Sequence, residues 1–178
     1  MKKILKIIII ILILIPLLLG LILIFDNGKL KYSEEITINQ SIDIVNTLFE
    51  NIYNMKKYMP GTKAILLISG KNGEENANYK ITIEAGDQTM DMTAVLKKNN
   101  LPDSLQMYYK MPGVLNIMTQ RHKKISEEKT LIINEQEFQL RGVMKILAFF
   151  QPPGFNLEAF KKQSNIYLVE FKKFAEQQ

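Results

Sequence analysis

Two regions with different patterns of apolar and polar residues make up the chain. From Ile4 to Phe25 the residues are apolar with one charged exception, Lys6. A helix that crosses about 30 Å of hydrocarbon needs roughly 20 apolar residues, whereas a signal peptide has a shorter apolar stretch and a small-residue cleavage site, which is missing here. We therefore expect residues 1–28 to be a retained transmembrane anchor with the start of a linker, and residues 29–178 to be one soluble domain.

The soluble part opens with a strand and one or two short helices. After a polar linker over residues 26–33, the segment Glu35–Asn39 alternates apolar and polar residues, as a half-buried strand does. Ser41 is a candidate N-cap for a helical run that continues to Met59, with apolar residues three and four apart. The pair Pro60-Gly61 then ends the helical run.

The middle of the chain is a succession of alternating segments joined by turn residues, which is typical of hairpin-connected antiparallel strands. The expected strands are residues 63–69, 79–85, 90–96, 105–111, 114–125 and 129–140. Beyond a break at Pro152-Pro153-Gly154, apolar residues from Leu157 to Ala175 fall three or four apart and predict a long amphipathic helix. The pattern therefore predicts an α+β domain that ends in a helix packed by its apolar stripe.

This order of elements resembles the helix-grip fold of the START-related superfamily (SRPBCC), which includes birch-pollen-allergen-like proteins and polyketide cyclases or dehydrases. The segment Ile36–Gly61 carries the likeness, because its strand gives way to a helix at Ser41 and its second helix ends near Tyr58 and Pro60. The resemblance implies a curved antiparallel sheet of about seven strands packed on the long C-terminal helix, with an apolar cavity between them. It also implies lipid-transport-like binding or cyclase chemistry in that cavity.

Charge bears on the possible partners and on orientation. The net charge of +5 falls to +2 once Lys2, Lys3 and Lys6 are set aside, because 20 Lys+Arg then stand against 18 Asp+Glu. A nucleic-acid binder normally carries a basic face, so we expect no nucleic-acid partner. The same lysines outnumber Lys29 and Lys31 on the other flank of the apolar run. The positive-inside rule then favours a single-pass protein whose soluble domain lies on the non-cytoplasmic side.

Candidate catalytic chemistry is sparse. His122 is the only histidine, and its place in the positive stretch 120–124 at a strand end favours a solvated side chain over a catalytic one. Without cysteine, carboxylates would have to supply any metal site, and Asp87 with Asp91 falls short of a ligand set. No phosphate-binding glycine loop, dinucleotide fingerprint or G-x-S-x-G motif occurs, so we expect no cofactor and no metal.

The sequence allows two glutamates on the last predicted strand to face either solvent or the cavity. Glu135 and Glu137 lie two residues apart and therefore share one face. If Ile132, Phe138 and Leu140 point inward, both glutamates face solvent, and we favour this phase. The opposite phase would bring two carboxylates into the cavity, where each would perturb the pKa of the other.

The methionines on the predicted strand faces are a more distinctive feature than these ionisable residues. Flexible thioethers fill irregular space and adapt to ligands of different shapes, although an ordinary core also uses them as filler. The candidate ligand-binding residues from these strands and from the last helix are Met90, Met92, Met107, Tyr109, Met111, Tyr167 and Phe171.

Three functions remain open at this point. The first is a membrane-tethered module that holds a hydrophobic or amphipathic small ligand, such as a lipid, under the C-terminal helix. The second is a polyketide cyclase-like enzyme acting through polar groups such as Tyr109, Asn116 or Glu135. The third is a structural or partner-binding domain with a filled core. An ionisable side chain facing the cavity would favour the enzyme, and because no clear candidate exists, we favour the binding module.

Overall fold

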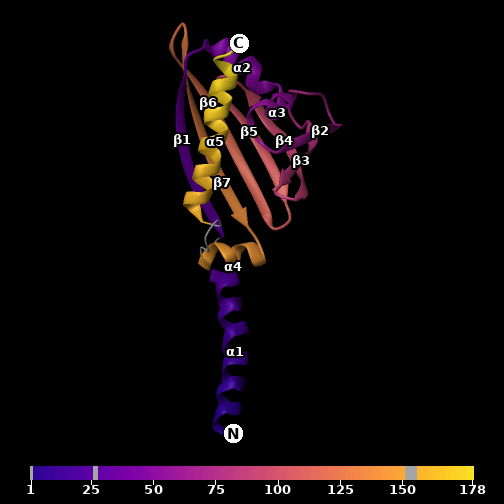
Figure 1. Cartoon of the computed structure of the whole chain (residues 1–178), viewed down its shortest axis with the longest axis vertical. Helices are drawn as coiled ribbons and strands as arrows, with labels where there is room; N and C mark the ends of the chain where they lie inside the picture. Colours follow the sequence, from indigo (N-terminus) through magenta and orange to yellow (C-terminus); the bar gives the residue numbers. More distant parts are fainter. Residues whose placement is uncertain (1, 26–27, 151–155) are drawn as a thin grey trace.

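The structure, a computed structural model, describes residues 2–25, 28–150 and 156–178 (Figure 1). Its helices are α1 (Lys2–Phe25), α2 (Ile42–Glu50), α3 (Met55–Tyr58), α4 (Val143–Phe150) and α5 (Leu157–Ala175), with a 3-10 turn η1 (Ile52–Asn54). Its strands are β1 (Lys29–Ile38), β2 (Thr62–Ser69), β3 (Asn78–Ala85), β4 (Gln88–Asn100), β5 (Ser104–Met111), β6 (Val114–Ser126) and β7 (Lys129–Leu140). Asn27 of the expected linker and the expected break at Pro152-Pro153-Gly154 lie outside the described residues.

Seven antiparallel strands form one sheet in the order β1-β7-β6-β5-β4-β3-β2. Each strand from β2 to β6 pairs with the next strand along the chain, as expected of hairpins. The first strand instead pairs with the last, from Lys29 opposite Gln139 to Ile38 opposite Thr130. The segment containing α2, η1 and α3 therefore carries the chain from one edge of the sheet to the other, and the predicted helix-grip arrangement is confirmed.

Helix α5 lies along one face of the curved sheet, called the inner face below (Figure 1). Its residues Leu168 and Phe171 are buried in the main apolar core together with Ile38 of β1 and Ile132 of β7. Burial of one such side chain stabilises the fold by about 1.5–3 kcal/mol. The side chain of Asn156 caps the helix, since it accepts a hydrogen bond of 2.9 Å from a backbone N–H in the first turn.

The connection from α3 to β2 depends on a glycine. Met55 and Tyr58 of α3 are buried in the core, so the chain must leave the helix abruptly to start the edge strand. Gly61 has a φ of +88°, and a Cβ there would come within 2.7 Å of the carbonyl oxygen of Glu84. Glycine avoids both the strained conformation and the clash, and its own carbonyl accepts a 2.8 Å hydrogen bond from the Glu84 N–H. The expected helix stop is therefore also the start of β2.

Helix α1 projects from the domain, and α4 lies where the two meet (Figure 1). The 19 residues Lys3–Leu21 are long and apolar enough to cross a membrane, and none of this stretch is buried against the domain. Helix α4 contacts α1, and Nζ of Lys145 donates a 2.6 Å hydrogen bond to the carbonyl of Leu23. Phe149 and Phe150 of α4 are more than half exposed, at 53% and 59%. The base of the domain thus presents apolar side chains beside α1.

Strand β1 is longer than the sequence pattern predicted. It begins at Lys29, so most of the expected linker is strand. Its outward-facing residues Lys29 and Lys31 form ion pairs with Glu137 of β7, at 3.8 and 2.7 Å. Glu34 takes an inner-face position and so interrupts the apolar alternation that would have identified the strand. The sequence pattern also did not predict helix α4.

Candidate functional site

A cavity of about 310 Å³ lies between α5 and the inner face of the sheet. Its volume is within the range of roughly 300–1,000 Å³ that is usual for small-molecule sites. The apolar and aromatic lining residues are Tyr32, Phe49, Tyr58, Met59, Ile83, Met90, Met92, Tyr109, Met111, Met118, Phe138, Phe160, Tyr167, Leu168 and Phe171. The polar lining residues are Asn116, Gln120, Asn134, Gln136, Gln163 and Ser164.

Most of the candidate residues from the sequence come together in this cavity. Met90, Met92, Tyr109, Met111, Tyr167 and Phe171 all line it. Met107 does not, which corrects its assignment. It is 5% exposed, belongs to the main core, and borders a separate hollow of about 20 Å³. The physical reason is that Met107 lies farther along β5, where Phe49 and Glu50 at the end of α2 cover the sheet and close the space.

The two sides of the cavity differ in chemistry. Met92 of β4 and Met111 of β5 belong to neighbouring strands, and their thioethers line one side together with Met90. Met90 is 42% exposed and Gln163 of α5 is also exposed, so the cavity opens to solvent between β4 and α5. The opposite side, on β6 and β7, carries the amide side chains. A bound molecule would therefore meet adaptable apolar groups near the opening and polar groups farther in.

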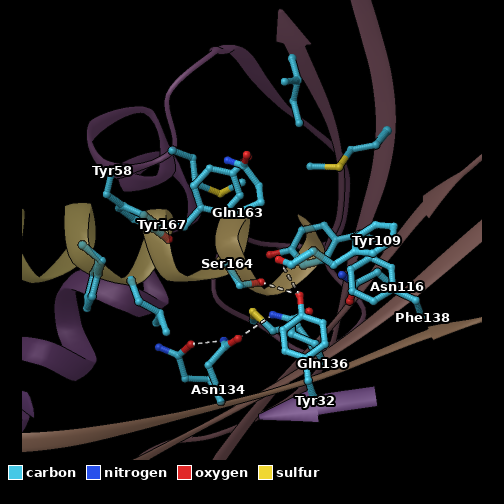
Figure 2. Close-up of a pocket in the computed structure, with 18 of the residues that line it drawn as sticks. Tyr32, Tyr58, Tyr109, Asn116, Asn134, Gln136, Phe138, Gln163, Ser164 and Tyr167 are labelled. Atoms are coloured by element: carbon cyan, nitrogen blue, oxygen red, sulfur yellow. Dashed lines mark hydrogen bonds between the residues drawn. The ribbon is translucent and has the colours of Figure 1, made fainter. Parts of the chain in front are cut away.

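Tyrosine hydroxyls are the ionisable groups in the lining. The Tyr32 hydroxyl lies 2.7 Å from Oγ of Ser164 and donates a 3.1 Å hydrogen bond to the carbonyl of Phe160, so β1 is tied to α5 (Figure 2). Burial raises the pKa of Tyr32 to about 12, and it raises the pKa of Tyr58 and Tyr109 as well. These phenols therefore stay protonated and neutral at physiological pH.

His122 is buried, which corrects the expectation of a solvated side chain. It is 4% exposed because it continues the inner-face phase of Met118 and Gln120 along β6. Its Nδ1 lies 2.6 Å from Oδ1 of Asn46 on α2, and the Phe49 ring packs against the imidazole with centroids 5.6 Å apart. Burial lowers the pKa of His122 to about 4, so the ring is neutral at neutral pH.

A row of three amides, Gln120, Asn134 and Gln136, extends from His122 into the cavity and is called the amide row below. Nε2 of Gln120 lies 3.1 Å from Nε2 of His122. Nδ2 of Asn134 donates to Oε1 of Gln120 over 2.8 Å, and Nε2 of Gln136 donates to Oδ1 of Asn134 over 2.6 Å (Figure 2). These buried polar groups are joined in a single network, as buried polar groups generally must be.

The two glutamates on β7 point away from the cavity, as the favoured phase predicted. Glu135 lies 3.5 Å from Nε of Arg121, and Glu137 is paired with Lys31. The hydrogen-bonded ammonium of Lys31 lowers the pKa of Glu137. Of the groups proposed for cyclase chemistry, Tyr109 and Asn116 line the cavity and Glu135 does not. Within the part of the chain that the structure describes, no cluster of His, Cys, Asp or Glu could hold a metal ion.

Sequence reasoning passed over the amide row, together with Tyr32 and Ser164, as site residues. The signal available in the sequence was the presence of polar residues at inward-facing positions of a strand. Asn134 and Gln136 alternate with the outward glutamates and share the face of Ile132 and Phe138, where apolar residues are the norm. An amide at such a position needs a partner, so a run of them marks either a buried network or a polar binding site.

Comparisons with known proteins identify the fold. No protein-family model matches the sequence, and no curated protein matches it either. Among solved structures, Ara h 8.0201 matches with a TM-score of 0.66 at 14% identity, over 85% of this chain and 100% of that one. The Zhui aromatase/cyclase from Streptomyces sp. R1128 matches with a TM-score of 0.67 at 11% identity, over 84% and 94%.

A third similar structure is norcoclaurine synthase from Thalictrum flavum in complex with dopamine and hydroxybenzaldehyde. It has a TM-score of 0.61 at 11% identity and covers 84% of this chain and 87% of its own. All three identities are low, so the likeness concerns the backbone arrangement. Together with the strand order and the packing of α5, it shows that residues from β1 to α5 adopt the helix-grip fold of the START-related (SRPBCC, Bet v 1-like) proteins.

Proposed function

We propose that this protein is a membrane-tethered binding module that holds an apolar or amphipathic small molecule, such as a lipid, in the cavity under α5. The observation that carries the proposal is the chemistry of the lining. Among the lining residues that the structure describes, none is Asp, Glu, Lys, Arg or His, and the phenols are neutral. Such a lining favours an uncharged, largely apolar molecule, because a buried unpaired charge is costly. The cavity volume of about 310 Å³ also disfavours a filled core.

One of the similar structures supports a small-molecule site in this cavity by analogy. The norcoclaurine synthase was solved with dopamine and hydroxybenzaldehyde, which are small aromatic molecules. The ligand-binding residues that we propose here are Met90, Met92, Tyr109, Met111, Tyr167 and Phe171, with the polar lining residues beside them.

A variant that fills the cavity tests the binding proposal. Met111 is half-buried and lines the cavity, whereas its neighbour Lys110 on β5 is exposed on the other face. Met111→Trp should occupy space that a ligand needs, and Lys110→Trp should not. We expect mass spectrometry of extracts from the purified full chain to find the same apolar species with wild type and Lys110→Trp, and much less of it with Met111→Trp. Equal amounts from all three proteins would contradict the proposal.

The membrane tether rests on α1 and on the surface beside it. The apolar stretch of α1 has the length of a bilayer crossing. Val143, Phe149 and Phe150 of α4 are exposed next to the end of α1, where they could insert at the boundary between headgroups and acyl chains. Phenylalanine is typical of the face that an interfacial helix buries at this depth. We therefore propose that residues 1–28 form the anchor and that residues 29–178 form an independent domain.

Deletion of residues 1–28 tests both parts of this division. We expect the full chain to stay with membranes after alkaline carbonate washing and the truncated chain to be released. The truncated chain should still unfold cooperatively, because none of the α1 side chains that the structure describes belongs to the two apolar core clusters. A truncated chain that remained in the membrane, or that lost cooperative unfolding, would contradict the division. In intact membranes that have not been washed with carbonate, protease added from outside should reach the C-terminus if the N-terminal lysines set the orientation. A protected C-terminus would reverse this assignment.

A cyclase-like enzyme is the second candidate, and one observation favours it. Tyr109 and Asn116, which lie opposite each other on β5 and β6, both line the cavity. A neutral phenol can donate a proton or a hydrogen bond to a bound carbonyl. Conversion of the co-purified molecule by wild type, and its loss with Tyr109→Phe, would favour the enzyme over the binding module.

A further inference from the structure

The hydrogen bonds of the amide row run in one direction. Oδ1 of Asn46 can only accept, so the proton of the neutral His122 ring is on Nδ1, and Nε2 accepts from the amide nitrogen of Gln120. Each amide oxygen of Gln120 and Asn134 then accepts from the nitrogen of the next amide. Reversing a single amide would set oxygen against oxygen or nitrogen against nitrogen. The direction is therefore a property of the whole row and is set by the proton on His122.

The cavity end of this row is an acceptor without a donor. Gln136 is 9% exposed, and its Oε1 is buried with no hydrogen-bond partner among the described residues. Oδ1 of Asn116 is likewise buried and unpaired in the described part of the chain. On the paired strands β6 and β7, Asn116 is opposite Phe138 and Met118 is opposite Gln136, so the two amides are diagonal neighbours. Both line the cavity (Figure 2).

We propose that the cavity selects apolar molecules that carry a hydrogen-bond donor, a hydroxyl or N–H group, which Oε1 of Gln136 and Oδ1 of Asn116 accept. This inference rests on the proposed function, because it names the chemistry of the ligand in the same cavity. A donor placed there satisfies oxygens that are otherwise buried without a partner, and leaving such groups unpaired costs free energy. The methionine side of the cavity takes the apolar body of the same molecule.

The arrangement also discriminates against related ligands. At Oε1 of Gln136, the polar group of a carboxylate, ester, ether or ketone offers only oxygen lone pairs, so no proton lies between the two oxygens. Gln136 cannot rotate its amide to offer Nε2 instead without breaking its 2.6 Å bond to Asn134. A site whose buried groups require a donor rejects an analogue without one much more strongly than an apolar pocket rejects a small change of shape.

A matched pair of probes tests this selectivity. β-Naphthol and its methyl ether share the same aromatic rings, but only the naphthol has a donor. We expect the full chain in phosphatidylcholine nanodiscs to bind β-naphthol roughly ten-fold more tightly than the ether, once uptake by empty nanodiscs is subtracted. Gln136→Met keeps the length of the side chain and removes Oε1, but it also leaves Oδ1 of Asn134 without its donor. It should therefore reduce this preference and leave binding of the ether nearly unchanged.

The control is Gln139→Met, three residues farther along β7 on the outer face, which should keep the ten-fold preference. If Gln136→Met does not fold, Asn116→Leu gives the same comparison and should reduce the preference. Equal binding of both probes by wild type, or an undiminished preference in a folded Gln136→Met protein, overturns the donor selectivity and leaves the binding module in place. Failure of wild type to bind either probe overturns the cavity function itself, and the selectivity with it.

Discussion

Replacing Phe171 with alanine should lower the free energy of unfolding by about 3 kcal/mol, the lower part of the range for a buried phenylalanine. Its ring is 1% exposed and lies edge-on to Phe49 and Tyr58, with centroid distances of 5.4 and 4.9 Å. These contacts join α5 to α2 and α3. Part of the ring also borders the cavity, so truncation to alanine removes fewer packing contacts there than in a filled core. We therefore expect a loss of stability in the lower part of that range.

The matched control for this change is Lys162→Ala, an exposed position on the same helix, which should shift stability by less than about 0.5 kcal/mol. Denaturant unfolding of the full chain in mild detergent measures both. An equally small effect of the two substitutions would mean that α5 does not hold the sheet as described. Adding an apolar probe should restore part of the loss in Phe171→Ala if the enlarged cavity still binds it.

Acidification should destabilise the domain through His122. The pKa of this histidine is about 4 in the folded protein and 6.5 in the unfolded chain, so between these values only the unfolded chain takes up the proton. Stability is therefore unaffected above pH 6.5 and falls as the pH decreases toward 4. A shift of this size corresponds to about 3 kcal/mol.

A comparison with His122→Gln isolates this contribution. Glutamine can still bond to Asn46 and Gln120 but does not titrate, while all carboxylates remain common to both proteins. Denaturant unfolding at intervals between pH 7 and pH 4 should show wild type losing about 3 kcal/mol more than the variant. An equal loss of stability in the two proteins would mean that burial does not lower the pKa of His122.

The sheet and the last helix could be predicted from the sequence because their burial follows a simple period. On β7, the residues at even numbers from Thr130 to Leu140 are all buried, which is the phase that the sequence analysis favoured from Ile132, Phe138 and Leu140. The same reasoning failed on β1, where Glu34 occupies an inner-face position. It also failed on α4, where Val143, Leu147, Phe149 and Phe150 are exposed. Met144 and Ala148 of this helix pack against a small second cluster instead of the main core.

The candidate site could be predicted only in part for a related reason. Periodicity places Met92, Tyr109 and Phe171 on inward faces, but it cannot tell a packed core from a cavity, as the position of Met107 shows. His122 was misplaced because three cationic neighbours made its segment resemble a solvated strand end. Its burial depends on Asn46, which is 76 residues away in sequence and supplies the hydrogen-bond partner. Such long-range pairing has no local signal.

The junction between α1 and β1 limits where this protein can work. The carbonyl of Gly28 accepts a 2.7 Å hydrogen bond from the N–H of Leu140, so the chain is already fixed to the sheet at that glycine. Only residues 26 and 27 separate it from the end of α1 at Phe25, a span of at most about 11 Å when fully extended. With α1 in a bilayer, the domain cannot travel to a second membrane. Under the proposed function, it would load and unload its ligand at the membrane that anchors it, and onward movement of that ligand would require another carrier.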